Sequence, residues 1–409
     1  MHGIEKGFRI GFNYYQAATL VSCKHNLLSA GENPQVVDQY IEKELKLNRM
    51  AVVQNPELQH MMQCSPFGVI PKKHKPGKWR LIVDLSAPEG ASVNDGIRKE
   101  DCSVSYVSTD NVIQCILSLG QGSLLAKMDI KEAYRMIPVH PEDRHLLAVR
   151  WKGVTYVDKV LPFGLRSSAI IFSAVADALQ WLMERHGARH IFHYVDDFIA
   201  VGRPLSAECA DTLTIMKATC SESGAPIEEE KCEGPATTLP FLGMELDTVK
   251  LEIRLPSDKL ERLKSLTAEW KGRKAGIKRE LLSLIGILNH ACKAVRQGRT
   301  FLRRLIDLSK AVKHPNHFIR LNAAARSDIM WWYEFASTWN GVSMLSDRRR
   351  TSPDTFVTSD ASGRWGCGAY CEADWFQLQW GPESIHLHIT IKELIEEQFI
   401  QRSYDTIQH

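Results

Sequence analysis

The sequence lacks the features of a membrane-spanning or secreted protein. No uncharged apolar stretch reaches the roughly 18 residues that a bilayer-spanning helix needs. The first 30 residues contain no compact apolar block that ends in a cleavage-like site. The ten cysteines lie singly, without a CxxC pair, which is typical of reduced thiols. We therefore expect a cytoplasmic or nuclear protein that makes no contact with a membrane.

What is present is the composition of an ordinary globular protein of 409 residues, 44% of them hydrophobic and 24% charged. At about 100 to 200 residues per domain, this length predicts two to four domains. The net charge is only +3, but residues 254–326 contain eighteen Lys or Arg and five Asp or Glu. This local excess favours a polyanionic partner such as nucleic acid. The alternative is a solvated basic surface on helices.

Strand-like and helix-like segments alternate up to about residue 250, and the segment after it is helical. The predicted elements are a mostly helical stretch without candidate chemistry over residues 1–60, a hairpin with a basic tip over 67–94, a buried strand over 124–130, a helix from Ser167 to His186, a hairpin over 190–202, a helix from Ser206 to Gly224, and three short strands with a helix after residue 353. This mixture predicts an α+β fold.

Three aspartates stand at the ends of apolar strands. Asp129 ends the strand predicted over 124–130, and Asp196 and Asp197 lie at the turn of the hairpin over 190–202. If these strands are neighbours in one sheet, the three carboxylates meet at one edge. Clustered carboxylates suit Mg²⁺, and two such ions support phosphoryl transfer. YVDD by itself also arises by chance, so an ordinary acidic turn is the alternative.

Five stretches of the chain follow one another in the order and at the spacing typical of reverse transcriptases. They are FGVIPKKHKPGKWRLIVDL from Phe67, KMDIKEAYRMIPV from Lys127, LPFGLRSSAIIF from Leu161, YVDD from Tyr194 and LPFLGMEL from Leu239. Together they span about 180 residues, which is far more specific than any single motif. The chain therefore resembles the reverse transcriptase family.

The resemblance implies a right-hand polymerase of fingers, palm and thumb, followed by a connecting segment and a truncated ribonuclease H-like α/β module. The expected parts are an N-terminal helical extension (1–60), fingers and palm (61–250), the thumb (251–315), the connection (316–352) and a partial ribonuclease H-like domain (353–409). In the thumb, the basic helices would follow the duplex backbone. Leu242 and Gly243 resemble the primer grip.

The same resemblance assigns roles at the reaction centre. Asp129, Asp196 and Asp197, with the backbone carbonyl of Ile130, would hold two Mg²⁺ ions, or Mn²⁺ in their place. The primer 3′-hydroxyl would attack the α-phosphate of a dNTP and expel pyrophosphate. The residues expected at the nucleotide are Lys73 and Arg80 at the triphosphate, Tyr134 as the gate against a ribose hydroxyl, Phe163 beside the sugar, and Gly164 for close backbone approach. A solvated basic hairpin and a core tyrosine are the alternatives for the first three.

The C-terminal stretches TSDASGRWGCGAY and ITIKELIEE resemble the start of a ribonuclease H domain. Asp360 and Glu393 match the first two of the four acids that hold metal ions in that fold. No strand and later helix with the other two acids precede His409, so we expect little or no ribonuclease H activity. The sequence of these stretches is most similar to DIRS-like retrotransposon polyproteins, and we expect a fragment or a decayed copy of one.

The reading favoured by these residues is an RNA-directed DNA polymerase that acts on a primed RNA or DNA template and on dNTPs. One alternative is a catalytically decayed, nucleic-acid-binding remnant of a retrotransposon. A viral RNA replicase is disfavoured because replicases usually have a second aspartate near the position that Tyr134 occupies here. The oligomeric state is left open by the sequence.

Overall fold

The computed structural model describes residues 2–14, 22, 25–72, 77–344, 357–371, 374–389 and 391–393 of the chain. The chain divides into two compact units, Met1–Met344 and Leu345–His409. Both helices and strands build the first unit, as the predicted α+β fold requires. In the described part of the chain, no helix has the length and apolar character that crossing a membrane demands.

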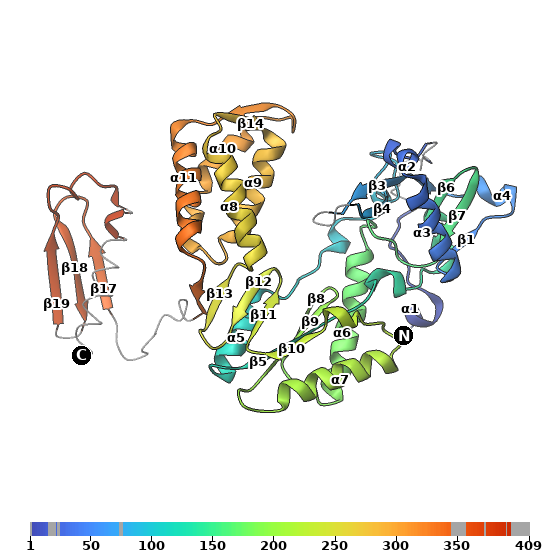
Figure 1. The fold of residues 1–409 in the computed structure, drawn as a ribbon, viewed down its shortest axis with the longest axis horizontal. Helices are drawn as coiled ribbons and strands as arrows, with labels where there is room; N and C mark the ends of the chain where they lie inside the picture. The colour runs from blue at the N-terminus through green and yellow to red at the C-terminus, as the bar shows by residue number, and fades with distance from the viewer. Residues whose placement is uncertain are drawn as a thin grey trace. The chain divides into compact units, whose positions relative to one another are not determined.

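A four-stranded antiparallel sheet, which we call the palm sheet, lies at the centre of the first unit in the order β10-β5-β9-β8 (Figure 1). Its strands are β5 (Leu124–Asp129), β8 (Ile191–Tyr194), β9 (Asp197–Gly202) and β10 (Glu233–Ala236). Along β9, Phe198 and Ala200 enter one core and Ile199 and Val201 the other. Because both faces are covered, this strand has no charged residue after Asp197. The predicted hairpin over residues 190–202 is confirmed.

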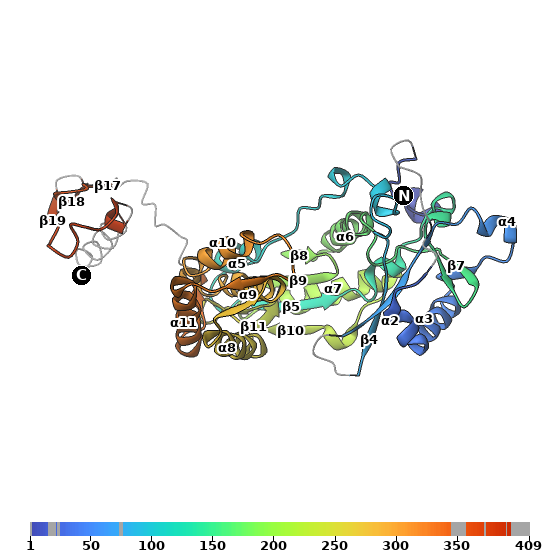
Figure 2. The ribbon, with the colours of Figure 1, turned by 90° about the horizontal axis from the view of Figure 1, so that it is seen from above.

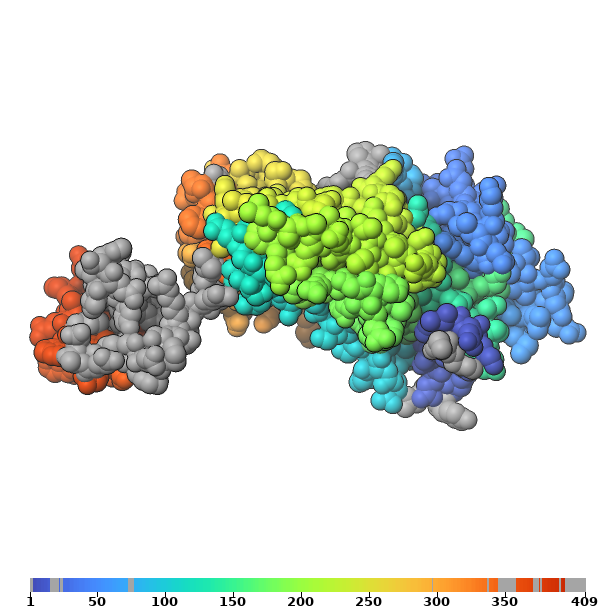
Figure 3. Space-filling view, turned by 90° about the horizontal axis from the view of Figure 1, so that it is seen from below, coloured from blue at the N-terminus to red at the C-terminus, as the bar shows by residue number. Residues whose placement is uncertain are grey.

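Helices cover the two faces of the palm sheet. On one face, Phe172 of α6 (Ser168–Arg185) and Met216 of α7 (Glu208–Glu222) join the same core as Phe198. The green and yellow-green surface in Figure 3 belongs to this layer. On the other face, α5 (Thr109–Leu119) packs with Ile199 and Val201. The predicted helices 167–186 and 206–224 are confirmed within two residues at each end.

A region that we call the fingers contains the hairpin of β3 (Phe67–Pro71) with β4 (Trp79–Val83), which confirms the hairpin predicted there. The other fingers elements are α1 (His2–Lys6), α2 (Leu28–Glu32), α3 (Pro34–Lys46), β1 (Met50–Val52), α4 (Pro56–Gln59), β2 (Cys64–Ser65), β6 (Ala148–Trp151) and β7 (Val154–Asp158). The expectation of a mostly helical segment over residues 1–60 is wrong at β1. There, Met50 to Val52 add a strand to β7, in a sheet of order β1-β7-β6-β2.

Helices on the other side of the palm sheet form a layer that we call the thumb, together with the segment after it (Figure 2). They are α8 (Ser257–Lys271), α9 (Lys278–Ala291), α10 (Arg303–Lys310) and α11 (Ala323–Thr338), with the short strands β14 (Ala275–Ile277) and β15 (Phe318–Arg320). Beneath them lies a sheet of β11 (Thr238–Phe241), β12 (Met244–Asp247), β13 (Glu252–Arg254) and β16 (Val342–Ser343). Leucines of α9 and Trp332 of α11 are fully buried in their shared core, so α11 packs with the thumb.

The second unit contains a three-stranded antiparallel sheet of β17 (Val357–Ala361), β18 (Gly366–Cys371) and β19 (Asp374–Gln379). Ala361, Cys367 and Trp380 form its small core. The three strands predicted after residue 353 are therefore present.

Candidate active site

A tight turn places two aspartates at the tip of the β8–β9 hairpin. Tyr194 and Asp197 are paired across the two strands, so only Val195 and Asp196 connect them. Val195 has a φ of 56°, which is uncommon for a β-branched residue. Such strain is retained where the surrounding structure fixes the backbone. The apolar strands on both sides fix it here, and the acids lie at the sheet edge.

The neighbouring strand brings the third aspartate to the same place. Strands β5 and β9 are antiparallel, and Asp129 is directly opposite Asp197. Directly opposed residues point to the same face of a sheet, with their Cβ atoms about 5 Å apart. Just beyond the strand, the backbone N–H of Ile130 donates to the carbonyl of Asp196 at 2.9 Å. The predicted meeting of Asp129, Asp196 and Asp197 at one edge is therefore confirmed.

The surroundings of Asp196 and Asp197 raise the pKa of both carboxyl groups. Burial, then the charge of Asp196 and a hydrogen bond with Asp129, raise the pKa of Asp197 to about 6. Burial is also the main cause that raises the pKa of Asp196, and the charge of Asp129 adds to it. Crowded acids of this kind are typical of sites that bind a cation or move protons.

Lys231, which our reading of the sequence did not select, supplies a cation at this cluster. It ends a short 3-10 helix, η5 (Glu229–Lys231), and its Nζ donates to both carboxylate oxygens of Asp129 at 2.9 and 2.8 Å. The hydrogen bond to Asp129 is the main cause that raises the pKa of Lys231. The positively charged ammonium of Lys231 is therefore part of the site, next to Asp129.

The donor set fits divalent cations. Three carboxylates supply the hard oxygen ligands that Mg²⁺ and Mn²⁺ prefer, and the ammonium of Lys231 already stands beside them as a cation. Within the described ranges, no group of three or more acids, histidines or cysteines is arranged to hold a metal ion as it stands. Both oxygens of Asp129 already accept hydrogen bonds from the Lys231 ammonium. Metal binding would require this ammonium to release Asp129.

Two aromatic side chains lie together close to the aspartates. Tyr134 belongs to the 3-10 helix η3 (Ala133–Met136), and its ring centre lies 5.3 Å from that of Phe163. Tyr134 also makes a T-shaped contact with Phe172 of α6, with 5.8 Å between ring centres. Phe172 is fully buried, whereas Phe163 is 59% exposed. Tyr134 thus packs against one buried ring, Phe172, and one exposed ring, Phe163.

The loop after Phe163 meets the fingers hairpin. Gly164 has a φ of 91°, and a Cβ added there would lie 3.2 Å from the carbonyl oxygen of Val83 at the end of β4. The side-chain amide of Asn94, another residue that the sequence reading missed, donates to the Gly164 carbonyl at 2.9 Å. Arg80 lies exposed on β4, whereas Lys73 falls outside the described residues. Arg80, Tyr134, Phe163 and Gly164 are therefore on elements that contact one another.

The remaining predicted residues fall into two places. Leu242 and Gly243 form the two-residue turn between β11 and β12, with φ values of 47° and 75°. The carbonyl of Gly243 accepts hydrogen bonds from Lys259 of α8 at 3.0 Å and from the ring of His290 of α9 at 3.1 Å. This fixes the turn to the thumb. In the second unit, Asp360 lies exposed on β17, and Glu393 is also exposed.

Comparison with known proteins gives a consistent result. Residues 70–246 match the family described as "Reverse transcriptase (RNA-dependent DNA polymerase)". The chain is 24% identical over 326 residues to the Gag-Pro-Pol polyprotein of Mason-Pfizer monkey virus, covering 75% of this chain and 17% of the polyprotein. It is 26% identical over 229 residues to the Pro-Pol polyprotein of Feline foamy virus, covering 56% of this chain and 17% of the polyprotein. The chain thus spans less than a fifth of these relatives.

The fold is shared with solved structures of a foamy viral protease-reverse transcriptase. The structure in complex with dsDNA gives a TM-score of 0.61 at 18% identity, over 97% of this chain and 76% of that chain. The structure in complex with an RNA/DNA hybrid gives 0.61 at 14% identity, over 96% of this chain and 49% of that chain. The predicted right-hand polymerase fold is therefore confirmed. Residues 70–246 are thus similar to the reverse transcriptase family, and the relatives found are retroviral polyproteins.

Proposed function

We propose that the chain is an RNA-directed DNA polymerase, which transfers dNMP from a dNTP to a primer 3′-hydroxyl on an RNA or DNA template. The observation that carries this proposal is the position of Asp129 directly opposite Asp197, with Asp196 beside them at the same sheet edge. The likeness to polymerases that were solved with dsDNA and with an RNA/DNA hybrid supports it.

In this proposal, Asp129, Asp196, Asp197 and the carbonyl of Ile130 hold two Mg²⁺ ions, with Mn²⁺ as the alternative. Bound there, the ions would activate the attacking hydroxyl and neutralise the charge on the departing phosphate. The protein's own contribution is to hold these ligands on rigid strands, so that little reorganisation is needed during the reaction. The ladder between β5 and β9 gives Asp129 and Asp197 that rigidity.

The surrounding residues would bind the two substrates. Arg80 and Lys73 bind the triphosphate through charged hydrogen bonds. Tyr134 excludes a ribose 2′-hydroxyl, while Phe163 and Gly164 lie along the sugar and base. On the primer side, the turn at Leu242 and Gly243 contacts the strand end, and the basic thumb helices contact the duplex backbone.

The setting of the domain is also part of the proposal. We infer that it comes from a DIRS-like retrotransposon polyprotein that works in the cytoplasm or nucleus, and that residues 353–409 belong to a ribonuclease H-like module. The described residues there supply two of the four expected acids, Asp360 and Glu393. We therefore expect the purified chain to leave the RNA of a labelled hybrid intact. Degradation that Asp360→Asn abolishes would contradict this expectation.

Primer extension on poly(rA)/oligo(dT) with Mg²⁺ tests the proposed function. The native protein should incorporate dTTP, and Asp196→Asn should not. Absence of incorporation by folded native protein would favour the nucleic-acid-binding remnant. Preference for UTP over dTTP would favour an RNA replicase.

A second test concerns Lys231 and needs no nucleic acid. Lys231→Gln should lower the apparent Kd for Mg²⁺ about 10-fold, which corresponds to about 1.4 kcal/mol. The reason is that Mg²⁺ then no longer competes with the ammonium for Asp129. Calorimetric titration of the free protein measures the change. The control is Lys217→Gln, because Lys217 forms its ion pair with Glu229 in the same region. An equal or higher Kd in Lys231→Gln would show that the ammonium does not compete for the site.

A further inference from the structure

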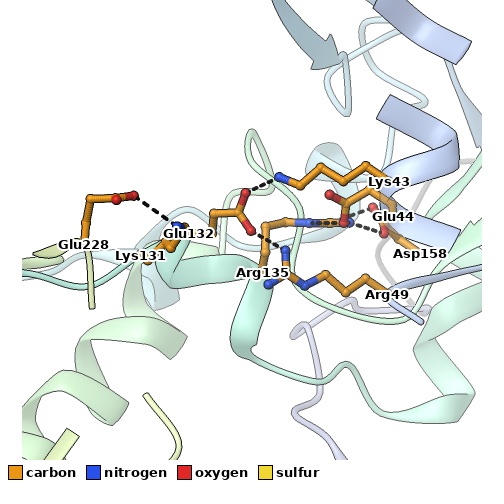
Figure 4. Close-up of polar contacts among 8 residues, drawn as sticks. All are labelled: Lys43, Glu44, Arg49, Lys131, Glu132, Arg135, Asp158 and Glu228. Carbon is orange, nitrogen blue, oxygen red and sulfur yellow. Dashed lines mark hydrogen bonds and ion pairs between the residues drawn. The ribbon is translucent and has the colours of Figure 1, made fainter. Parts of the chain in front are cut away.

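The N-terminal helix α3, in which our reading of the sequence found no chemistry, is joined by ion pairs to the segment that follows Asp129. Figure 4 shows these contacts. We call this group of ion-paired residues the fingers tether. Its members are Lys43, Glu44, Arg49, Glu132, Arg135 and Asp158. Two of its members, Glu132 and Arg135, stand on either side of Tyr134 in the sequence. The tether therefore acts on the residues that build the nucleotide site.

Arg135 forms the buried half of the tether. Its Nη1 and Nη2 donate to the two oxygens of Asp158 at 2.9 and 2.8 Å, which is a bidentate pair. Its Nε and Nη2 both donate to one oxygen of Glu44, at 3.2 and 2.6 Å. The side chains of Arg135, Glu44 and Asp158 are only 3%, 3% and 6% exposed. A planar guanidinium held between two carboxylates has very little freedom to rotate or shift.

Glu132 forms the more accessible half, with a side chain that is 29% exposed. It has a φ of 50°, a left-handed conformation that costs energy for a residue other than glycine or asparagine. Its carboxylate accepts one hydrogen bond from Lys43 at the end of α3 and one from Arg49, just before β1. The fingers therefore hold the backbone in this conformation immediately before η3 begins.

The opposite side of the same segment is fixed to the palm. The backbone N–H of Lys131 donates to the carbonyl of Pro226 at 2.8 Å, and its Nζ lies 3.5 Å from a carboxylate oxygen of Glu228. The N–H of Glu228 in turn donates to the carbonyl of Asp129 at 2.9 Å. The segment 130–135 is thus held between the palm and the fingers tether, and loss of either side would let it move.

We propose that Glu132 and Arg135 are positioning residues for the incoming nucleotide, and that α3 thereby sets how tightly dNTP binds and how strongly the sugar is selected. This inference rests on the proposed function. The short helix η3 has only four residues, so contacts from outside largely decide its position. Tyr134 meets Phe163 and Phe172 on one side, while Arg135 is held by α3 and β7 on the other. A shift of η3 would move the Tyr134 ring relative to the sugar.

The test uses Glu132→Asn in the full chain. Asparagine accepts the left-handed conformation, so the variant removes the carboxylate while retaining the backbone. We expect KM for dNTP to rise about 10-fold and the preference for dNTP over rNTP to fall about 10-fold, as is typical for residues that orient a site. We expect kcat and the Kd for primer–template to change less than about twofold. Single-nucleotide incorporation with dTTP and UTP measures these quantities.

Two further variants connect the effect to the tether. Arg49→Met should give the same rise in KM, and the double variant should add nothing to either single change, because both remove one contact. Arg135→Lys retains the charge but loses the planar fork, and we expect a similar or larger rise. The control is Asp143→Asn, which breaks the ion pair of a buried aspartate with Arg9, another link from the N-terminal segment to the body of the unit. Its KM and sugar preference should stay unchanged.

The outcomes separate this inference from the proposed function. A native protein that extends primers, together with Glu132→Asn that retains both native KM and native sugar preference, overturns the inference alone. A purely structural role of Glu132 would also overturn it. In that case, Glu132→Asn and Asp143→Asn would lower the fraction of active protein to the same extent, while KM and sugar preference would stay unchanged. A folded native protein without polymerase activity overturns the proposed function and the inference with it. If Arg135→Lys does not fold, Glu132→Asn and Arg49→Met still decide the question.

Discussion

Replacing Asp129 by asparagine is expected to lower the rate of dNMP incorporation about 1,000-fold, the scale seen when one preorganised electrostatic group is removed. Asp129 lies directly opposite Asp197, and both of its oxygens already bind the ammonium of Lys231. Asparagine retains the size of the side chain but loses its charge, so the variant cannot neutralise a divalent cation equally well. Single-turnover incorporation on a preformed primer–template, with Mg²⁺ in excess, measures the loss.

The control for this experiment is again Asp143→Asn. Asp143 is also buried and is ion-paired with Arg9, but it lies on η4 (Pro141–Leu146), which is not part of the palm sheet. It should retain the native rate per folded molecule, with circular dichroism used to measure the folded fraction of both variants. If Asp129→Asn retained more than about a tenth of the native rate, the carboxylate would contribute less than about 1.4 kcal/mol to the transition state. That result would contradict the proposed role of Asp129.

The parts of this structure that could be predicted from the sequence have local causes. The β8–β9 hairpin follows from two apolar runs separated by two acids, and α6 follows from apolar residues at helical spacing that end before Gly187. The convergence of Asp129 with Asp197 needed one further assumption, that β5 and β9 are neighbours, and the order of motifs supplied it. Local pattern and motif order together therefore located the acids.

The parts that could not be predicted depend on contacts between residues far apart in the sequence. Lys231 reaches Asp129 across 102 positions, and nothing in its acidic surroundings marks it as different from a surface lysine. Arg135 reaches Glu44 across 91 positions, and a helical pattern in α3 does not show which of its acids is buried. Asn94 is likewise recognised only once the loop at Gly164 lies beside it. Single-sequence patterns carry no information on such pairs.

The strand β1 illustrates a related limit. Met50 to Val52 begin four residues after the end of α3 at Lys46, and they are too few to show a period of two. They form a strand because β7 offers an unpaired edge, with Met50 opposite Asp158. That pairing also brings Arg49 to Glu132, since Arg49 directly precedes the strand. The element that the sequence reading missed is therefore the one that completes the fingers tether.

Replacing Tyr134 by alanine is expected to lower the preference for dNTP over rNTP about 100-fold, the scale at which an apolar pocket rejects an added hydroxyl. The ring packs against Phe172 and lies 5.3 Å from Phe163, so its removal leaves a space where we propose that the sugar binds. Incorporation of dTTP should fall far less, because no charge at the carboxylates changes. The ratio of kcat/KM for dTTP and UTP on the same primer–template measures the effect.

Tyr134→Phe is the matched control, because it retains the ring and removes only the hydroxyl. Exclusion by volume predicts native sugar preference for this variant, whereas recognition by the tyrosine hydroxyl predicts the same loss as in alanine. Equal sugar preference in Tyr134→Ala and the native protein would mean that this ring does not face the sugar. In that case, Glu132→Asn could not act through Tyr134 either, so the two experiments constrain one another. If the fingers tether positions a gate that the tyrosine ring itself forms, Tyr134→Ala and Glu132→Asn should both lower the preference for dNTP over rNTP. The loss should be larger in Tyr134→Ala.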